Sequence, residues 1–183
     1  NIGLRKASTD FVMVLNSDVI VTPNWSKKLL APMIRFNDIC ITSALSNAAL
    51  WQSVPYIFDK EENYCINTLP TGFNLDSFSL EIEKQFYEKY AEVSMVNGFC
   101  IVIRKSLLNE IGYFNEQDFP IGYGEETDFC IRTCKQGYKI LIMLDTYIYH
   151  HKSSSFGHEQ RNKLVIEGNK KISSLYGEDQ IKR

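Results

Sequence analysis

Three short groups of residues carry side chains suited to catalysis or metal binding, and the first is Asn16-Ser17-Asp18. The preceding apolar run, residues 11–15, consists of strand formers and predicts a buried parallel strand. Ligands of open α/β sheets bind outside the carboxyl ends of the strands, where Asp18 would lie. A carboxylate there can hold Mg²⁺ or Mn²⁺ against a diphosphate. The alternative interpretation is that Asn16 and Asp18 are ordinary turn formers.

The second group is the run Gly-Glu-Glu-Thr-Asp at residues 124–128, where a helix is predicted to begin. A carboxylate in a partly closed site can act as a general base that removes a proton from an attacking hydroxyl. The alternative is that the acidic residues only complement the dipole of the helix, which favours negative charge in the first turn.

The third group is His150-His151, which follows an apolar strand-like segment. Imidazole can complete a metal site, whereas the alternative is a strand-end pair with one ring inward and one exposed. The Ser-rich residues 153–157 predict a loop beside these histidines. Because each of the three groups falls at a predicted strand end or helix start, we expect them to converge on one rim of a sheet.

The segments that would position these groups alternate between strands and helices, which indicates an α/β layered domain. Strands are predicted at residues 11–15, 19–21, 39–43, 93–104 with a break at Asn97-Gly98, 139–144 and 146–149. Helices are predicted at residues 22–36, 80–91, 105–111, 125–136 and 158–176. Residues 44–80 are expected to form a long loop region, and long loops in compact domains are often functional.

Bulk composition excludes several classes of protein. A chain of 183 residues that is 44% hydrophobic can build one domain with a real core, so disorder is not expected. The net charge of −2, with lysine and arginine scattered, argues against nucleic acid as a partner. The longest apolar runs are too short to span a bilayer, and the polar first ten residues do not resemble a signal peptide.

The cysteines indicate neither zinc nor disulfides. There are five, an odd number, and no pair has CxxC spacing. Cys130 and Cys134 lie four apart on a predicted helix, where two apolar-facing thiols are favoured over metal binding. Reduced cysteines are compatible with the cytoplasm.

The order of motifs along the chain resembles glycosyltransferase family 2, a family of GT-A fold that often builds bacterial surface polysaccharides. The motifs are Leu15-Asn-Ser-Asp18-Val-Ile-Val, Asn97-Gly98-Phe-Cys-Ile-Val-Ile-Arg104, Ile111-Gly-Tyr-Phe114-Asn-Glu116, Gly124-Glu-Glu-Thr-Asp-Phe-Cys-Ile-Arg132, Gly137-Tyr-Lys and Tyr149-His150. Each motif alone is weak, but six in the same order are specific, and they cover almost the whole chain.

The resemblance implies a metal site and a catalytic base. Asp18 matches the last carboxylate of the family's Asp-x-Asp metal motif, in which Asn16 replaces the first carboxylate. His150 matches a histidine that contacts the metal or the diphosphate, with His151 as the alternative if the register differs by one residue. The implied cofactor is Mn²⁺ or Mg²⁺.

The catalytic pair implied by the resemblance is Glu125-Glu126, with Glu126 at the position of the base. A glutamate in place of the family's aspartate lengthens this base by one methylene.

Further contacts to the donor or the acceptor are implied at Asn16, Asn97, Gly98, Asp128 and Trp51. A glycine at position 98 permits close approach of the backbone. Trp51 and Tyr123 would offer ring faces to an acceptor sugar, and the alternative for both is aromatic packing in the core or a loop.

The resemblance also implies an architecture: a three-layer GT-A-type domain with a mostly parallel central sheet. Residues 1–183 are expected to be one partial domain that lacks the amino-terminal nucleotide-binding strands, with residues 158–183 as a carboxyl-terminal helical segment.

The implied reaction moves a sugar, with inversion, from a nucleoside diphosphate sugar to a hydroxyl of a saccharide or lipid-linked acceptor, in polysaccharide or glycoconjugate synthesis. The implied location is the cytoplasm, and a lipid-linked acceptor is compatible with peripheral association at the inner face of the cell membrane. Two other functions stay open: a non-catalytic carbohydrate-binding or assembly module, and a metal-dependent phosphohydrolase using Asp18, Glu126 and His150.

Overall fold

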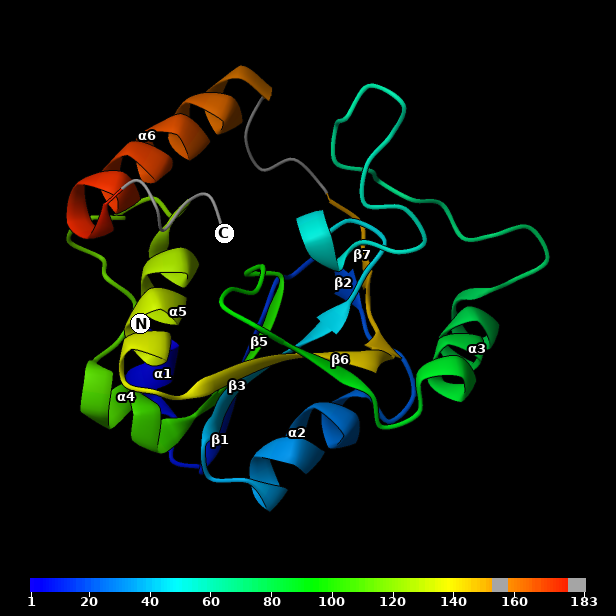
Figure 1. Cartoon of the computed structure of the whole chain (residues 1–183), viewed down its shortest axis with the longest axis horizontal. Coiled ribbons are helices and arrows are strands. Elements are labelled where there is room, and N and C mark those ends of the chain that lie inside the picture. The colour runs from blue at the N-terminus through cyan, green and yellow to red at the C-terminus, as the bar shows by residue number, and fades with distance from the viewer. Residues whose placement is uncertain (153–157, 178–183) are drawn as a thin grey trace.

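A five-stranded mixed sheet forms the centre of the computed structural model, which describes residues 1–152 and 158–177 (Figure 1). The strands run in the order β1 (Phe11–Leu15), β5 (Cys100–Arg104), β3 (Ile39–Leu45), β6 (Lys139–Tyr147) and β4 (Tyr90–Val93). A separate two-stranded ribbon pairs β2 (Val19–Ile20) with β7 (Tyr149–His150). The predicted α/β class is therefore confirmed.

The directions of the strands correct one prediction. Only β3 and β6 pair in parallel, whereas β1–β5, β5–β3 and β6–β4 are antiparallel, so the prediction of a mostly parallel sheet is wrong. The reason is that β5 is inserted between β1 and β3 and runs against both. Of the predicted strand at 93–104, residues 100–104 form β5 inside the sheet, and only Val93 belongs to β4, the edge strand. The chain crosses between these two strands through residues 94–99.

The inner strands β3, β5 and β6 are buried on both faces, which explains the apolar runs of β5 and β6. Successive residues of β5 point to opposite faces, so that Ile101 and Ile103 join one core cluster while Cys100 and Val102 join the other. On the first face the cluster includes residues of α3 (Leu75–Phe86), α4 (Lys105–Ile111) and α5 (Glu125–Lys135). On the other face it includes Leu29 and Met33 of α2 (Trp25–Arg35). The predicted three-layer arrangement follows from these two clusters.

The helix α3 begins earlier than predicted because of a capping motif. The Oδ1 atom of Asn74 accepts the Ser77 N–H at 2.8 Å, and the Ser77 hydroxyl oxygen accepts the Asn74 N–H at 2.9 Å. This reciprocal box satisfies two backbone donors at the start of the helix. The helix predicted at 80–91 therefore spans Leu75–Phe86, and residues 90–93 belong to β4. Two short helical elements, α1 (Ile2–Lys6) and the 3₁₀ turn η1 (Leu50–Gln52), complete residues 1–152.

The helix α6 (His158–Tyr176) has the predicted bounds and packs outside α5 (Figure 1). Its Ile172 is buried in a small cluster with Phe119 and Ile131. The ammonium of Lys171 lies 2.7 Å from a carboxylate oxygen of Asp118. Among the described residues no helix is both long and apolar enough to cross a bilayer. The loop predicted at 153–157 and the end of the predicted helical segment, 178–183, lie outside the described residues.

Candidate functional site

The ribbon formed by β2 and β7 brings the first and third groups of predicted site residues together. Val19 pairs with His150, and the His151 N–H donates to the carbonyl oxygen of Asp18 at 2.9 Å. The His150 Nε2 atom consequently lies 3.3 Å from the Oδ1 atom of Asp18. The amide nitrogen of Asn16 lies 3.3 Å from the same Nε2 atom. His151 is exposed, so His150 is the histidine that faces Asp18.

The hydrogen bonds of His150 determine which ring nitrogen can bind a cation. Its Nδ1 atom lies 3.1 Å from the carbonyl oxygen of Ala48, which can only accept, so the proton of a neutral ring resides on Nδ1. Burial of the ring lowers the pKa of His150 and favours this neutral form. The unprotonated Nε2 can therefore accept from the Asn16 amide at 3.3 Å, and the same atom lies beside the Asp18 carboxylate.

The pair formed by Asp18 and His150 fits a divalent cation. A carboxylate oxygen and an imidazole lone pair face each other, and the other ring nitrogen donates to a backbone carbonyl, as in histidines that bind metals. Among the described residues no group of three His, Cys, Asp or Glu side chains is suitably placed, so a cation here would have Asp18 and His150 as its two protein ligands. Mg²⁺ is commonly bound by one or two protein groups together with substrate phosphates and water.

A buried asparagine, which the sequence analysis did not identify, holds His150 in place. The Asn47 Oδ1 atom accepts the His150 N–H at 2.7 Å, and its Nδ2 atom donates to the His150 carbonyl oxygen at 3.1 Å. The Asn47 side chain is 1% exposed and thus acts as a two-point clamp on the backbone of β7. The one signal in the sequence is a polar Ser46-Asn47 pair directly after a buried strand.

The carboxylate of Glu126 lies on the first turn of α5 against Gly98. A Cβ atom added to Gly98 would lie 3.7 Å from the Glu126 Oε1 atom, an ordinary contact distance. The Oε2 atom of Glu126 is buried and has no hydrogen-bond partner among the described residues. Burial, and then the negative charge of Glu125, raises the pKa of Glu126 to about 7. A carboxylate with a pKa near the working pH is suited to accept and release a proton.

The other two acidic residues of this motif have partners within the protein. Glu125 accepts the backbone N–H of Gly124 at 3.2 Å. One carboxylate oxygen of Asp128 pairs with Arg132 at 2.7 Å, and the other accepts the Tyr176 hydroxyl at 2.5 Å. These contacts give Asp128 a structural role that joins α5 to α6, while its predicted contact with donor or acceptor stays a prediction.

The turn at Asn97-Gly98-Phe99 lies between the Asp18–His150 pair and Glu126. The Phe99 ring stacks on His150, with ring centroids 5.7 Å apart, and the Phe99 carbonyl oxygen accepts the Asn16 N–H at 2.9 Å. Gly98, the preceding residue, contacts Glu126. The structure thus assembles Asp18, His150 and Glu126 around one turn, as the sequence predicts.

The same turn is supported by Gln52, a second residue that the sequence analysis missed. The Gln52 Oε1 atom accepts the Asn97 N–H at 2.6 Å, and its Nε2 atom donates to the Ala44 carbonyl oxygen at 2.6 Å. Its neighbour Trp51 is half-buried and packs against the core, which agrees with the packing alternative. Tyr123 is also half-buried, and its carbonyl group lies against Gly168 of α6.

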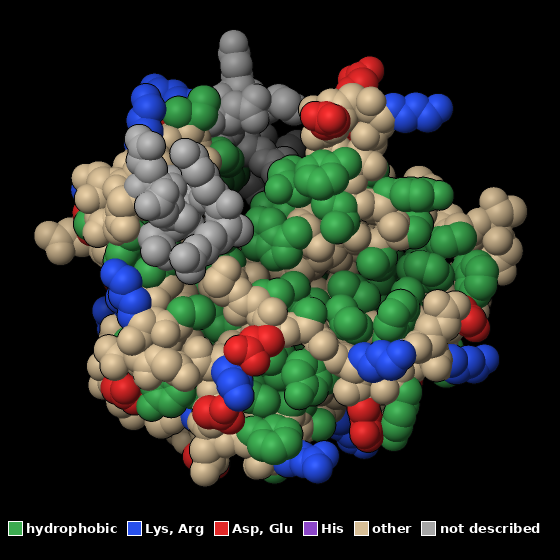
Figure 2. All heavy atoms as spheres, in the orientation of Figure 1, with side chains coloured by type: hydrophobic (Ala, Val, Ile, Leu, Met, Phe, Trp, Pro, Cys, Tyr) green, Lys and Arg blue, Asp and Glu red, His purple; other side chains and the backbone are tan. Residues whose placement is uncertain are grey.

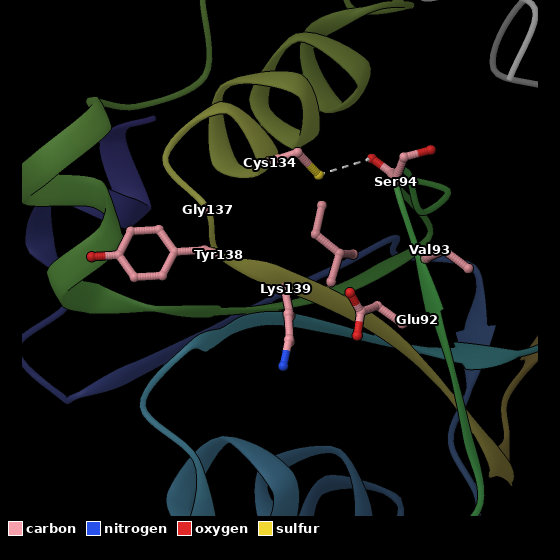
Figure 3. A pocket seen from close by; sticks show the side chains of 8 residues that line it. Glu92, Val93, Ser94, Cys134, Gly137, Tyr138 and Lys139 are labelled. Atoms are coloured by element: carbon pink, nitrogen blue, oxygen red, sulfur yellow. Dashed lines mark hydrogen bonds between the residues drawn. The ribbon is translucent and has the colours of Figure 1, made fainter.

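A hollow of about 400 Å³ between β4, the end of α5 and β6 contains none of the predicted site residues (Figure 3). Its lining includes Cys134, Glu92 and Lys139. Partial burial raises the pKa of the Cys134 thiol, so that thiol is a poor nucleophile near neutrality. This hollow is therefore not a candidate catalytic site.

Comparisons with known proteins identify the family of the chain. A family model described as "Glycosyl transferase family 2" matches residues 1–112. The chondroitin synthase of Pasteurella multocida (strain Pm70) is 23% identical over 164 residues, which are 82% of this chain and 17% of that protein. The uncharacterized protein y4gI of Sinorhizobium fredii (strain NBRC 101917 / NGR234) is 30% identical over 66 residues, 36% of this chain and 7% of that protein. The chain thus spans less than a fifth of either relative.

The fold is similar to that of a solved enzyme structure. The crystal structure of GalNAc-T7 with UDP, GalNAc and Mn²⁺ aligns with a TM-score of 0.56 and 18% sequence identity. The alignment covers 81% of this chain and 29% of that one. At this identity the likeness supports the GT-A-type fold alone.

Proposed function

The chain belongs to glycosyl transferase family 2, and from this membership we propose that it carries the catalytic site of a metal-assisted glycosyltransferase. The reaction would move a hexosyl or related sugar from a nucleoside diphosphate sugar to a hydroxyl group. The observation that carries the proposal is the assembly of Asp18 and His150 on one side of Phe99 and Gly98, with Glu126 on the other. Two similar proteins agree with it by name, a chondroitin synthase and GalNAc-T7, whose crystal structure contains UDP and Mn²⁺.

Asp18 and His150 would hold Mn²⁺ or Mg²⁺. When bound, such an ion supplies positive charge that stabilises a departing diphosphate. The protein keeps His150 in the required tautomer through Ala48 and in the required position through Asn47. The neutral ring and the carboxylate together contribute a single negative charge, which leaves a bound divalent cation with net positive charge toward the diphosphate.

Glu126 would act as the general base. Its carboxylate accepts the proton of the acceptor hydroxyl while the hydroxyl oxygen forms a bond to the anomeric carbon. The bond from that carbon to the diphosphate breaks, and the electron pair leaves with the diphosphate. A single displacement of this kind inverts the anomeric configuration. The buried Oε2 atom without a hydrogen-bond partner and the pKa near 7 support this role.

The setting we propose is polysaccharide or glycoconjugate synthesis in the cytoplasm, with a saccharide or lipid-linked acceptor. The relative named chondroitin synthase supports the first part. The five cysteines, all free, are compatible with the second.

The test is a thermal-shift series with nucleoside diphosphates and their sugars, with and without Mn²⁺, followed by NMR of the product's anomeric configuration. We expect metal-dependent stabilisation by one nucleotide class, lost in Asp18→Asn, and an inverted product. Retained configuration would overturn the single displacement. Phosphate release without an acceptor would identify a phosphohydrolase, and metal-independent sugar binding that is unchanged in Glu126→Gln would identify a binding module.

A further inference from the structure

Residues 56–66 form a hairpin-like excursion within the region predicted as a long loop. The Asp59 N–H donates to Asn63 O at 2.9 Å, and the Cys65 N–H donates to Ile57 O at 2.8 Å. Between these two pairs, Phe58 and Tyr64 form an antiparallel bridge, and their ring centroids are 4.9 Å apart. The register brings residues opposite each other on the two arms to the same face.

Phe58 and Tyr64 therefore share one face, and Tyr56 and Ile66 flank them at the base of the two arms. We call these four exposed side chains the aromatic face. Their exposed fractions are 53% for Phe58, 46% for Tyr64, 67% for Tyr56 and 63% for Ile66. Figure 1 shows the hairpin rising from the body of the molecule, and Figure 2 shows hydrophobic side chains gathered on this part of the surface. Contiguous exposed apolar side chains of this size usually mark a binding surface.

The base of the hairpin is joined by hydrogen bonds to the candidate metal site. The Asn67 side chain accepts the Tyr56 N–H at 3.2 Å and donates to Tyr56 O at 2.8 Å. Its Nδ2 atom and its backbone N–H both donate to Asn47 O, at 3.1 and 2.9 Å. Asn47 in turn clamps His150, so hydrogen bonds through two buried asparagines connect the base of the hairpin to His150.

Charge and ring chemistry decide which occupant this face suits. The turn of the hairpin carries Asp59, Glu61 and Glu62 against one cation, Lys60. This negative tip opposes an anionic membrane surface and a polymer of uronic acids. Aromatic rings have negative faces, which attract the C–H groups of a sugar ring, and the nearby carboxylates accept hydrogen bonds from sugar hydroxyls.

We propose that the aromatic face binds an uncharged saccharide chain that serves as the acceptor, an inference whose occupant rests on the proposed function. The turn that presents the face is held by the Asp59 carboxylate, which accepts the backbone N–H groups of Glu61 and Asn63, both at 2.9 Å.

The test is binding of the protein to an oligosaccharide array that contains neutral glucose and N-acetylhexosamine oligomers together with chondroitin oligomers. The variants are Phe58→Ala combined with Tyr64→Ala, and Ile34→Ala as a matched control, because Ile34 is a 68% exposed hydrophobic residue on α2. We expect neutral oligomers to bind the wild type, and the double variant to bind them at least about tenfold more weakly. Ile34→Ala should bind as the wild type does, and all three proteins should melt within a few degrees of one another, since the substituted side chains are exposed.

Three outcomes would overturn the proposal: no neutral oligomer binds, the double variant binds as well as the wild type, or chondroitin oligomers are preferred. Binding of phosphatidylglycerol vesicles, or dimerisation that the double variant abolishes, would assign the face to another occupant. The metal site is measured separately by Mn²⁺-dependent binding of UDP. If the wild type binds saccharide but does not bind UDP in the presence of Mn²⁺, the proposed function is refuted and the aromatic face remains a saccharide site.

Discussion

His150 turns its unprotonated ring nitrogen toward Asp18, because Nε2 lies 3.3 Å from Oδ1 while Nδ1 donates to the carbonyl oxygen of Ala48. In the proposed function a divalent cation binds these two atoms. The motif leaves His150 and His151 as alternatives, and the pairing of β2 with β7 places His150 beside Asp18. The two neighbouring histidines therefore form a natural pair of test and control.

The first prediction concerns metal affinity. Asp18→Asn and His150→Gln should each weaken Mn²⁺ binding by at least about a hundredfold, since loss of an outer-shell partner alone weakens binding about ten- to a hundredfold. His151→Gln should bind Mn²⁺ like the wild type, because its exposed ring is not the one that faces Asp18. Isothermal titration with Mn²⁺ in the presence of UDP measures all three. Equal affinities in the two histidine variants would refute the assignment of His150.

The second prediction concerns the base. Glu126→Gln should lower kcat by about a hundred- to ten-thousandfold, the usual contribution of a positioned general base. Because burial and the charge of Glu125 raise the pKa of Glu126 to about 7, the wild-type rate should rise with pH up to about 7 and then level off. A pH–rate profile of kcat checks this shape.

The neighbouring charge offers a sharper test of the same residue. Glu125→Gln removes a negative charge that raises the pKa of Glu126, so the rising limb of the profile should move to lower pH. A limb that stays in place in Glu125→Gln would show that another group controls the rate.

The third prediction concerns stability. Between about pH 4.5, the ordinary pKa of a glutamate, and about pH 7, the folded chain holds a proton on Glu126 that the unfolded chain has released. The free energy of unfolding should therefore fall as pH rises through this window, by on the order of 1–3 kcal/mol. Glu126→Gln should remove that fall and melt above the wild type at pH 8.

Thermal melts from pH 4 to pH 8 measure this effect. Glu61→Gln is the control, since Glu61 is exposed on the turn of the hairpin and its loss should leave the wild-type pH dependence in place. If the melting temperatures of Glu126→Gln and of the wild type change with pH in the same way, Glu126 is not the buried carboxylate that holds a proton in the folded chain.

Local patterns in the sequence predict the elements whose signals are local. The apolar run at Phe11–Leu15 and the helix His158–Tyr176 have the predicted bounds. The prediction that residues 11–15 form a buried parallel strand is wrong in both other respects, because β1 is a half-buried edge strand that runs antiparallel to β5. The direction of a strand leaves no such signal. A run buried on both faces, such as Cys100–Arg104, looks the same in a parallel or an antiparallel sheet, so the insertion of β5 between β1 and β3 could not be predicted.

The candidate site shows the same division. Asp18, His150 and Glu126 fall at element ends, where chemistry is expected, and the order of the motifs predicts them as site residues. Asn47 and Gln52 act through hydrogen bonds to backbone groups distant in sequence, those of His150 and Asn97, and a lone amide side chain carries no pattern. Asp128 has the acidic first-turn signature of its neighbours, and only the tertiary contacts with Arg132 and Tyr176 distinguish it.

The last prediction concerns Gly168, where α6 approaches the loop that leads into α5. A Cβ atom on Gly168 would lie 1.7 Å from the Tyr123 carbonyl oxygen, so Gly168→Ala must displace α6 or that loop. Overpacking of this kind costs about 1–3 kcal/mol, or roughly 3–10 °C in Tm for a chain of this size.

Gly3→Ala is the matched control, since Gly3 is also helical and nothing lies within 4 Å of its added Cβ. That variant should melt at or slightly above the wild type, because alanine is the better helix former. Because Tyr123 and Gly124 directly precede Glu125 and Glu126, Gly168→Ala should also lower kcat more than Gly3→Ala does, and equal melting of the two variants would refute the close packing of α6.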